Sequence, residues 1–129
     1  MKQILIVDDE VSICDLLLTF LRRQGYQADA VHDGEAALEW LAANNSDMLL
    51  LDIRMPGISG MDVLKKTRQL YPELPVIVIS GYADEVLARK ALREGAHDFF
   101  FKPFDLNTVE ARIFTKLALM DLEEKIGGP

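Results

Sequence analysis

Charged residues stand at the ends of three short apolar runs in this sequence. Asp8 and Asp9 follow the first run, Asp52 closes the second, and Lys102 follows the third. Clustered carboxylates repel one another unless a cation lies among them, and such hard oxygen ligands favour Mg²⁺ or Mn²⁺. A lysine beside them suits a group that brings its own negative charge, such as a phosphate. The sequence therefore predicts a metal site next to a place for an anionic group.

The acidic pair has a second explanation, because Asp and Glu also stabilise the N-terminus of a helix. Taken alone, Asp8 and Asp9 favour this capping role. Asp52 changes the balance, because it closes an apolar run ahead of a Met-Pro pair, where capping does not explain an acid. We therefore predict that the three acids together form a metal site.

Apolar runs and helical patterns alternate along the whole chain. Runs that are apolar at every position are typical of strands covered on both faces in a parallel sheet. The expected strands are 3–7, 27–31, 48–52, 76–79 and 97–101, and the expected helices are 11–23, 34–43, 61–70, 84–93 and 106–125. Gly25 is the expected stop signal of the first helix.

This alternation predicts a doubly wound α/β fold, specifically a flavodoxin-like five-stranded parallel sheet of order 2-1-3-4-5 with five helices. Ligands of such sheets bind beyond the carboxyl ends of the strands. The first and third strands are neighbours in this order, so we expect Asp8, Asp9 and Asp52 to lie side by side. Ser80 ends the fourth run, where its hydroxyl suits either a phosphoryl oxygen or a simple turn.

Composition narrows the class of protein. The chain has 129 residues, of which 50% are hydrophobic and 27% charged, which fits one globular domain with a real core. Its net charge of −7 argues against a nucleic-acid surface, and we expect no direct nucleic acid binding. Cys14 is the one cysteine, which we expect in the core of a cytoplasmic protein. We expect no association with a membrane, because no uncharged stretch reaches the about 20 residues that span a bilayer.

Four segments together resemble the receiver domain of two-component response regulators. They are ILIVDDE, LLLDIRMPGISG, VIVISGYAD and GAHDFFFKPF, they occur in the order and spacing of that family, and the likeness covers about residues 2–122. The resemblance implies a receiver domain at 1–122, followed at 123–129 by a tail or the start of a linker. It also implies phosphoryl transfer from a histidine kinase or a histidine phosphotransfer protein.

The resemblance assigns roles around the acidic residues. It implies that Asp52 is the phosphoacceptor, and that Asp8 and Asp9 organise Mg²⁺ together with Asp52 and the backbone carbonyl of Arg54. Such a domain catalyses only its own phosphorylation and dephosphorylation, so no independent enzyme is expected. Arg54 and Tyr82 occupy the two positions that tune the lifetime of the phosphorylated state in this family. Both are bulky enough to shield an acyl phosphate from water, so we expect slow autodephosphorylation.

The resemblance also implies a route by which the signal leaves the site. Ser80 and Lys102 would contact the phosphoryl group. Separately from the resemblance, the Lys102-Pro103 bond raises the chance of a cis peptide, which would aim the lysine inward. Movement of Ser80 would then rotate Phe99, which occupies the position of a Tyr in many members of the family. The alternative is that Phe99 is simply a residue of the hydrophobic core. The fourth helix, fifth strand and fifth helix would form the output face, which controls a partner, a homodimer or a missing output domain.

The last expected helix carries more apolar residues than one docking face requires. These residues are Val109, Ile113, Phe114, Leu117, Met120 and Leu122. Packing on the core explains part of this set. The surplus favours a surface for a partner or a second copy.

Two other classes of protein share this type of fold. A small metal-dependent phosphohydrolase of the haloacid dehalogenase type also uses an Asp nucleophile, but its paired acid two residues later is replaced here by Arg54, and it usually carries a cap insertion. A nucleotide-binding or flavin-binding domain would need a glycine-rich phosphate loop, and neither GxGxxG nor GxxxxGK[ST] occurs. The receiver resemblance is therefore the leading hypothesis.

Overall fold

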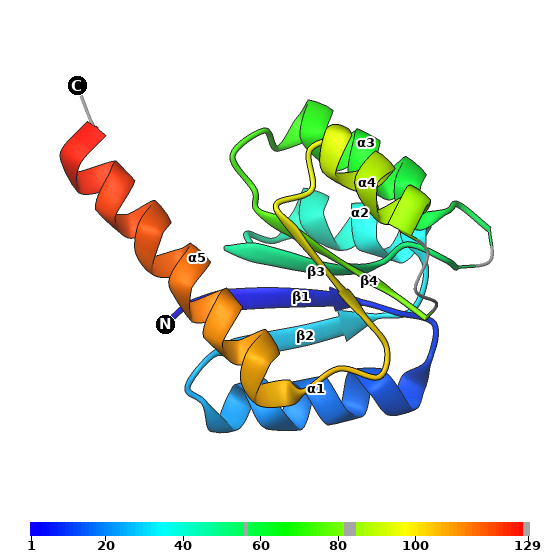
Figure 1. The fold of residues 1–129 in the computed structure, drawn as a ribbon, viewed down its shortest axis with the longest axis horizontal. Helices are drawn as coiled ribbons and strands as arrows, with labels where there is room; N and C mark the ends of the chain where they lie inside the picture. The colour runs from blue at the N-terminus through cyan, green and yellow to red at the C-terminus, as the bar shows by residue number, and fades with distance from the viewer. Residues whose placement is uncertain (56, 82–84, 128–129) are drawn as a thin grey trace.

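The computed structural model describes residues 1–55, 57–81 and 85–127 (Figure 1). Its strands are β1 (Gln3–Val7), β2 (Gln27–Val31), β3 (Met48–Asp52), β4 (Val76–Ser80) and β5 (Asp98–Phe101). Its helices are α1 (Val11–Arg23), α2 (Gly34–Ala43), α3 (Gly60–Leu70), α4 (Glu85–Arg93) and α5 (Leu106–Gly127). The predicted alternation of strands and helices is confirmed.

All five strands are parallel and form one sheet of order β2-β1-β3-β4-β5, as predicted. Alternate side chains of each strand enter opposite layers, because successive residues of a strand point to opposite faces. Leu5, Leu49 and Val78 pack with α2, α3 and α4 on one face, and Ile6 and its neighbours pack with α1 and α5 on the other (Figure 1). The sheet is thus covered on both sides.

The three inner strands are more deeply buried than the edge strand β5. Every residue of β3 and β4 is buried. In β5 only Phe100 is buried, and Phe99 and Phe101 are half-buried. The full burial that is typical of an apolar run therefore holds for Phe100 but not for Phe99 and Phe101, because β5 has a neighbouring strand on one side only.

Several elements have the predicted boundaries, and others differ from them by one or two residues. β5 begins at Asp98 instead of residue 97, and α5 continues to Gly127, two residues past its predicted end. The first helix ends as expected, with Gly25 at a φ of 96° that suits glycine. Cys14 is fully buried, which confirms its predicted place in the core.

Helix α5 is 22 residues long and extends beyond the sheet (Figure 1). Its buried residues Val109, Ile113 and Leu117 pack on the core. The surplus predicted from the sequence lies in part on the surface, where Phe114 and Leu122 are exposed together with Leu119 and Ile126. Within the described residues, no helix combines the length and apolar character that crossing a membrane requires.

The N-terminus of α3 lies directly against the end of β3. The backbone N–H of Gly60 donates to the carbonyl of Ile53 at 3.2 Å. A Cβ at residue 60 would lie 2.2 Å from the carbonyl oxygen of Asp52 and 2.4 Å from Cα of Ile53. Only glycine fits there, because backbone atoms cannot move aside as a flexible side chain can.

We therefore expect Gly60→Ala to lower the free energy of unfolding by more than about 2 kcal/mol, measured by urea denaturation. Gly81→Ala is the matched control, because a Cβ there meets no atom within 4 Å. Equal stability of the two variants would contradict this account of the α3–β3 contact.

Candidate functional site

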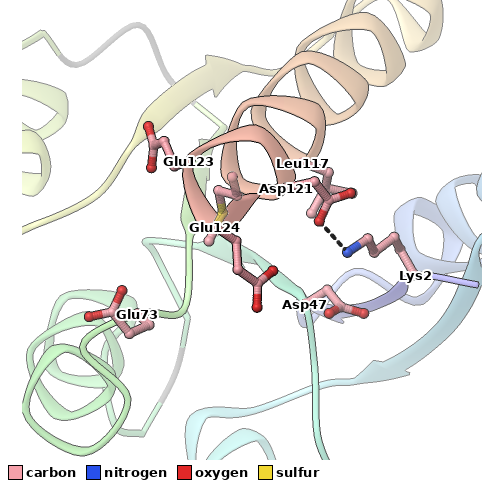
Figure 2. Close-up of a pocket in the computed structure, with 8 residues that line it drawn as sticks. Lys2, Asp47, Glu73, Leu117, Asp121, Glu123 and Glu124 are labelled. Carbon is pink, nitrogen blue, oxygen red and sulfur yellow. Dashed lines mark hydrogen bonds and ion pairs between the residues drawn. The ribbon is translucent and has the colours of Figure 1, made fainter. Parts of the chain in front are cut away.

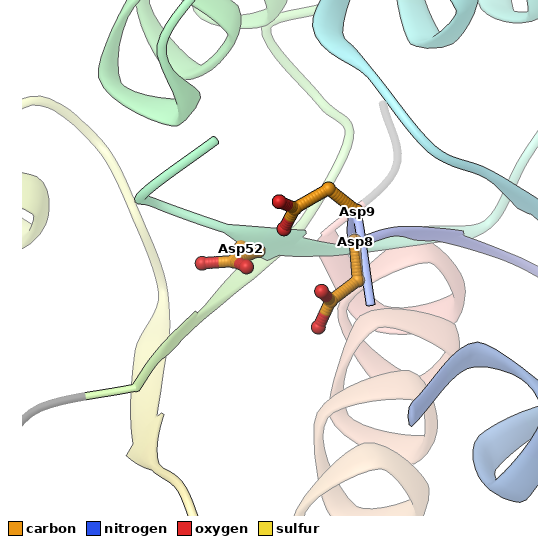
Figure 3. A group of neighbouring side chains, drawn as sticks. All are labelled: Asp8, Asp9 and Asp52. Atoms are coloured by element: carbon orange, nitrogen blue, oxygen red, sulfur yellow. The ribbon is translucent and has the colours of Figure 1, made fainter. Parts of the chain in front are cut away.

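Three carboxylates meet at the carboxyl ends of β1 and β3 (Figure 3). Asp8 follows β1 directly, Asp52 is the last residue of β3, and the two strands are paired neighbours. One oxygen from each of Asp8, Asp9 and Asp52 lies within 4.8 Å of the others. Asp8 and Asp52 are buried, whereas Asp9 is exposed. The sheet order therefore brings together the acids predicted to form a metal site.

Asp8 is held by its own loop. Its Oδ1 accepts a hydrogen bond from the backbone N–H of Glu10 at 2.9 Å. Its Oδ2 is buried and accepts no directed hydrogen bond from the described residues, although it forms an ion pair with Lys102 Nζ at 2.8 Å. A buried carboxylate oxygen with lone pairs to spare is a suitable ligand for a cation.

Asp52 is a buried acid with an unusual protonation equilibrium. Its Oδ1 accepts the backbone N–H of Arg54 at 3.0 Å, and its Oδ2 lies 3.5 Å from Lys102 Nζ. Burial raises the pKa of Asp52 to about 7 and the nearby charge of Asp8 adds to the rise, although the Arg54 N–H and the Lys102 charge oppose it. A divalent cation would supply the positive charge that this carboxylate lacks.

Lys102 reaches the acids from the end of β5. Its backbone N–H donates to the carbonyl of Ser80 at 2.7 Å, and the peptide bond to Pro103 is cis. Its side chain is 11% exposed and lies between Asp8, Asp52 and Glu10. Burial lowers the pKa of Lys102, but its ion pairs with Asp8 and Glu10 outweigh burial and raise that pKa above the ordinary value. The lysine therefore stays charged.

The remaining predicted site residues surround this centre. Ser80 is buried at the end of β4 and pairs with Phe101 of β5. The ring of Phe99 lies 5.2 Å from that of Phe101, and Phe99 packs against the core on the α2–α3–α4 side. Arg54 is exposed, and Tyr82 lies outside the described residues. The functional roles assigned to these residues stay predictions.

Glu10 is a residue of the site that was not predicted from the sequence. Its Oε1 lies 2.8 Å from Lys102 Nζ, as close as Asp8 Oδ2. Glu10 occupies the N-cap position of α1, where Ser, Thr, Asp or Asn is preferred, and its side chain makes no capping hydrogen bond. The sequence feature that could have indicated its role is the presence of an unfavourable N-cap residue directly after an acidic pair.

A separate hollow lies at the amino ends of the strands, opposite the acidic cluster (Figure 2). It is lined by Lys2, Asp47, Leu117 and Asp121, among others, and Lys2 forms an ion pair with Asp121 at 2.8 Å. This contact ties the far part of α5 to the start of β1. The hollow contains none of the predicted site residues, so the candidate site is the acidic cluster at the carboxyl ends of the strands.

The raised pKa of Asp52 predicts a pH-dependent stability of the metal-free protein. Asp52 stabilises the fold below its unfolded pKa, near 4, and this contribution is lost as the pH rises through about 7. In EDTA, Asp52→Asn should therefore be about 4 kcal/mol more stable than the wild type at pH 8 and nearly equal to it at pH 4. Urea denaturation across this range measures the difference, and a difference that does not grow with pH would contradict the raised pKa.

Comparisons with known proteins agree with this geometry. The family model of the response regulator receiver domain matches residues 4–114. The regulatory protein AtoC of Escherichia coli (strain K12) is 37% identical over 125 residues, which are 97% of this chain and 27% of AtoC. The chain thus spans about a quarter of the length of this relative.

Two solved structures extend the comparison. NtrX from Brucella abortus has a TM-score of 0.92 at 32% identity, covering 98% of this chain and 30% of NtrX. The response regulator protein TrrA from Thermotoga maritima, solved in complex with Mg²⁺-BeF, has a TM-score of 0.82 at 33% identity, covering 91% of this chain and 99% of TrrA. These comparisons give no support to the phosphohydrolase alternative. By its family match, its strand order and its cluster of acids, the chain belongs to the response regulator receiver domain family.

Proposed function

We propose that this chain is a phosphorylation-controlled switch in which Asp52 accepts the phosphoryl group. The observation that carries the proposal is the environment of Asp52. It is a buried carboxylate with two further acids close by and a lysine ammonium 3.5 Å from its Oδ2. Such a site pairs a nucleophile with the positive charge that phosphoryl transfer requires.

The proposed reaction is a displacement at phosphorus. An oxygen of Asp52 bonds to phosphorus while the bond between phosphorus and a histidine nitrogen of the donor breaks, and the imidazole leaves with the electron pair. The product is an acyl phosphate on Asp52. Attack by water later releases inorganic phosphate and regenerates the carboxylate. Because receiver domains of response regulators are phosphorylated by histidine kinases, the donor is a histidine kinase or a histidine phosphotransfer protein.

Asp8, Asp9 and Asp52, with the backbone carbonyl of Arg54, would hold Mg²⁺ or Mn²⁺ in this proposal. The all-oxygen donor set supports it, as do the buried Asp8 Oδ2, which accepts no directed hydrogen bond from the described residues, and the Mg²⁺ complex of TrrA. When bound, the cation would neutralise negative charge on the transferring group. Lys102 would stabilise the same oxygens from the other side, and Ser80 would donate its hydroxyl to one of them.

The signal would leave through β5. Ser80 pairs with Phe101, whose ring contacts that of Phe99, so movement at the phosphoryl group has a short path to the proposed switch residue. Phosphorylation would favour one of two pre-existing arrangements of the α4–β5–α5 face. We take residues 1–122 as the receiver and 123–129 as a tail or linker, of which residues 123–127 continue helix α5.

Binding of beryllium fluoride, a mimic of the phosphoryl group, tests the proposal. In excess Mg²⁺ it should raise the melting temperature of the wild type by several degrees, because a ligand that binds only the folded state stabilises it. Asp52→Asn should abolish the shift, whereas Asp29→Asn, on the exposed side of β2, should keep it. A full shift in Asp52→Asn would contradict the role of this residue.

Self-association through the α4–β5–α5 face is a second testable consequence. Val86 on α4 is 76% exposed, as expected of a surface that another copy covers. We expect the molar mass from light scattering to double with Mg²⁺ and beryllium fluoride, and Val86→Glu to prevent the doubling. Leu16→Glu on α1 is the control, and equal loss in both variants, or no mass change in the wild type, would contradict a dimer formed by this face.

A further inference from the structure

Glu10 has a side chain whose position its local structure does not explain. It stands at the N-cap of α1 with φ −83° and ψ 103°, yet its carboxylate makes no capping hydrogen bond. By contrast, Asp33 at the N-cap of α2 does form a capping hydrogen bond, because its side chain accepts from the backbone N–H of Ala36 at 2.7 Å. Glu10 instead turns across the site to Lys102.

The contact with Glu10 draws the lysine away from the phosphoacceptor. Lys102 Nζ lies 2.8 Å from Glu10 Oε1 and 2.8 Å from Asp8 Oδ2, but 3.5 Å from Asp52 Oδ2. Both short contacts are to residues that follow β1. The ammonium is therefore held on the β1 side of the site, although its proposed work is at the end of β3.

Glu10 also differs in its exposure from the other two acids that contact Lys102. Its side chain is 55% exposed, against 1% for Asp8 and 4% for Asp52. Water screens the Glu10 end of this ion pair, so the pair contributes less to stability than one with both ends buried and is exchanged at a smaller cost, although the Lys102 side chain is only 11% exposed. A contact that is short in the resting state and costs little free energy to break can hold the lysine reversibly, and we call such a contact a latch.

We propose that Glu10 is a positioning residue that holds Lys102 toward β1 in the resting state and releases it when a phosphoryl group occupies Asp52. This inference rests on the proposed function and deepens it. Glu10 then opposes activation, because the lysine must give up its contact with Glu10 before it reaches the phosphoryl oxygens. The residue sets how readily the switch turns on.

Three variants separate a latch from a plain charge effect. Glu10→Gln removes the charge. Glu10→Asp keeps the charge but shortens the side chain by one methylene group, and Asp is a preferred N-cap residue, so the fold is retained. Glu39→Gln on α2 makes the same change of net charge at an exposed position outside the site.

Two measurements test whether Glu10 holds Lys102: the affinity for beryllium fluoride and the rate at which Lys102 is chemically labelled. With saturating Mg²⁺, Glu10→Gln and Glu10→Asp should both bind beryllium fluoride about two- to fivefold more tightly than the wild type, and Glu39→Gln should match the wild type. In metal-free protein, acetic anhydride labelling followed by mass spectrometry should modify Lys102 faster in both Glu10 variants, with the exposed Lys65 as internal reference.

The outcomes are distinct. Tighter binding and faster labelling in both Glu10 variants would support the latch. Tighter binding in Glu10→Gln alone would overturn it, because charge repulsion would then suffice. Unchanged binding and labelling in both variants would also overturn it. A wild type that binds no beryllium fluoride would refute the proposed function, while the labelling would still test the contact between Glu10 and Lys102.

Discussion

The site depends on an imbalance of charge around one ammonium group. Lys102 Nζ is the single cation that contacts Asp8, Glu10 and Asp52 among the described ion pairs, and Asp9 adds a fourth acid. Burial raises the pKa of Asp52, the nearby charge of Asp8 adds to the rise, and Lys102 offsets only part of it, so Asp52 retains a proton to a higher pH than an ordinary aspartate does. At neutral pH, the clustered carboxylates would therefore be stabilised by a bound divalent cation or by movement of the Lys102 ammonium toward Asp52.

The parallel sheet makes this costly cluster possible. Because every strand runs in the same direction, the ends of β1, β3, β4 and β5 deliver their polar residues to one edge. The apolar runs that precede these residues fill both faces of the sheet with buried side chains, which offsets the cost of burying Asp8 and Asp52. Close contact of Gly60 with the backbone of Asp52 then fixes the position of the strand end.

Much of the fold followed from the sequence because its signals are local. An apolar run such as 48–52 predicts a strand. The alternation of such runs with helical patterns predicts parallel pairing of the strands, which places Asp52 beside Asp8. The partial exposure of Phe99 and the role of Glu10 were not predictable in this way. Both depend on tertiary neighbours: β5 lies at the edge of the sheet, and Glu10 meets a lysine 92 residues away.

The central claim is that Asp52, among the clustered acids, takes the phosphoryl group. Borohydride reduces an acyl phosphate to an alcohol and leaves a free carboxylate intact, so it marks the modified residue permanently. The protein would be treated with acetyl phosphate and Mg²⁺, reduced, and mapped by peptide mass spectrometry. The account predicts homoserine at residue 52 alone, and none when EDTA replaces Mg²⁺. Reduction at Asp8, Asp9 or Glu10, with residue 52 unmodified, would contradict it.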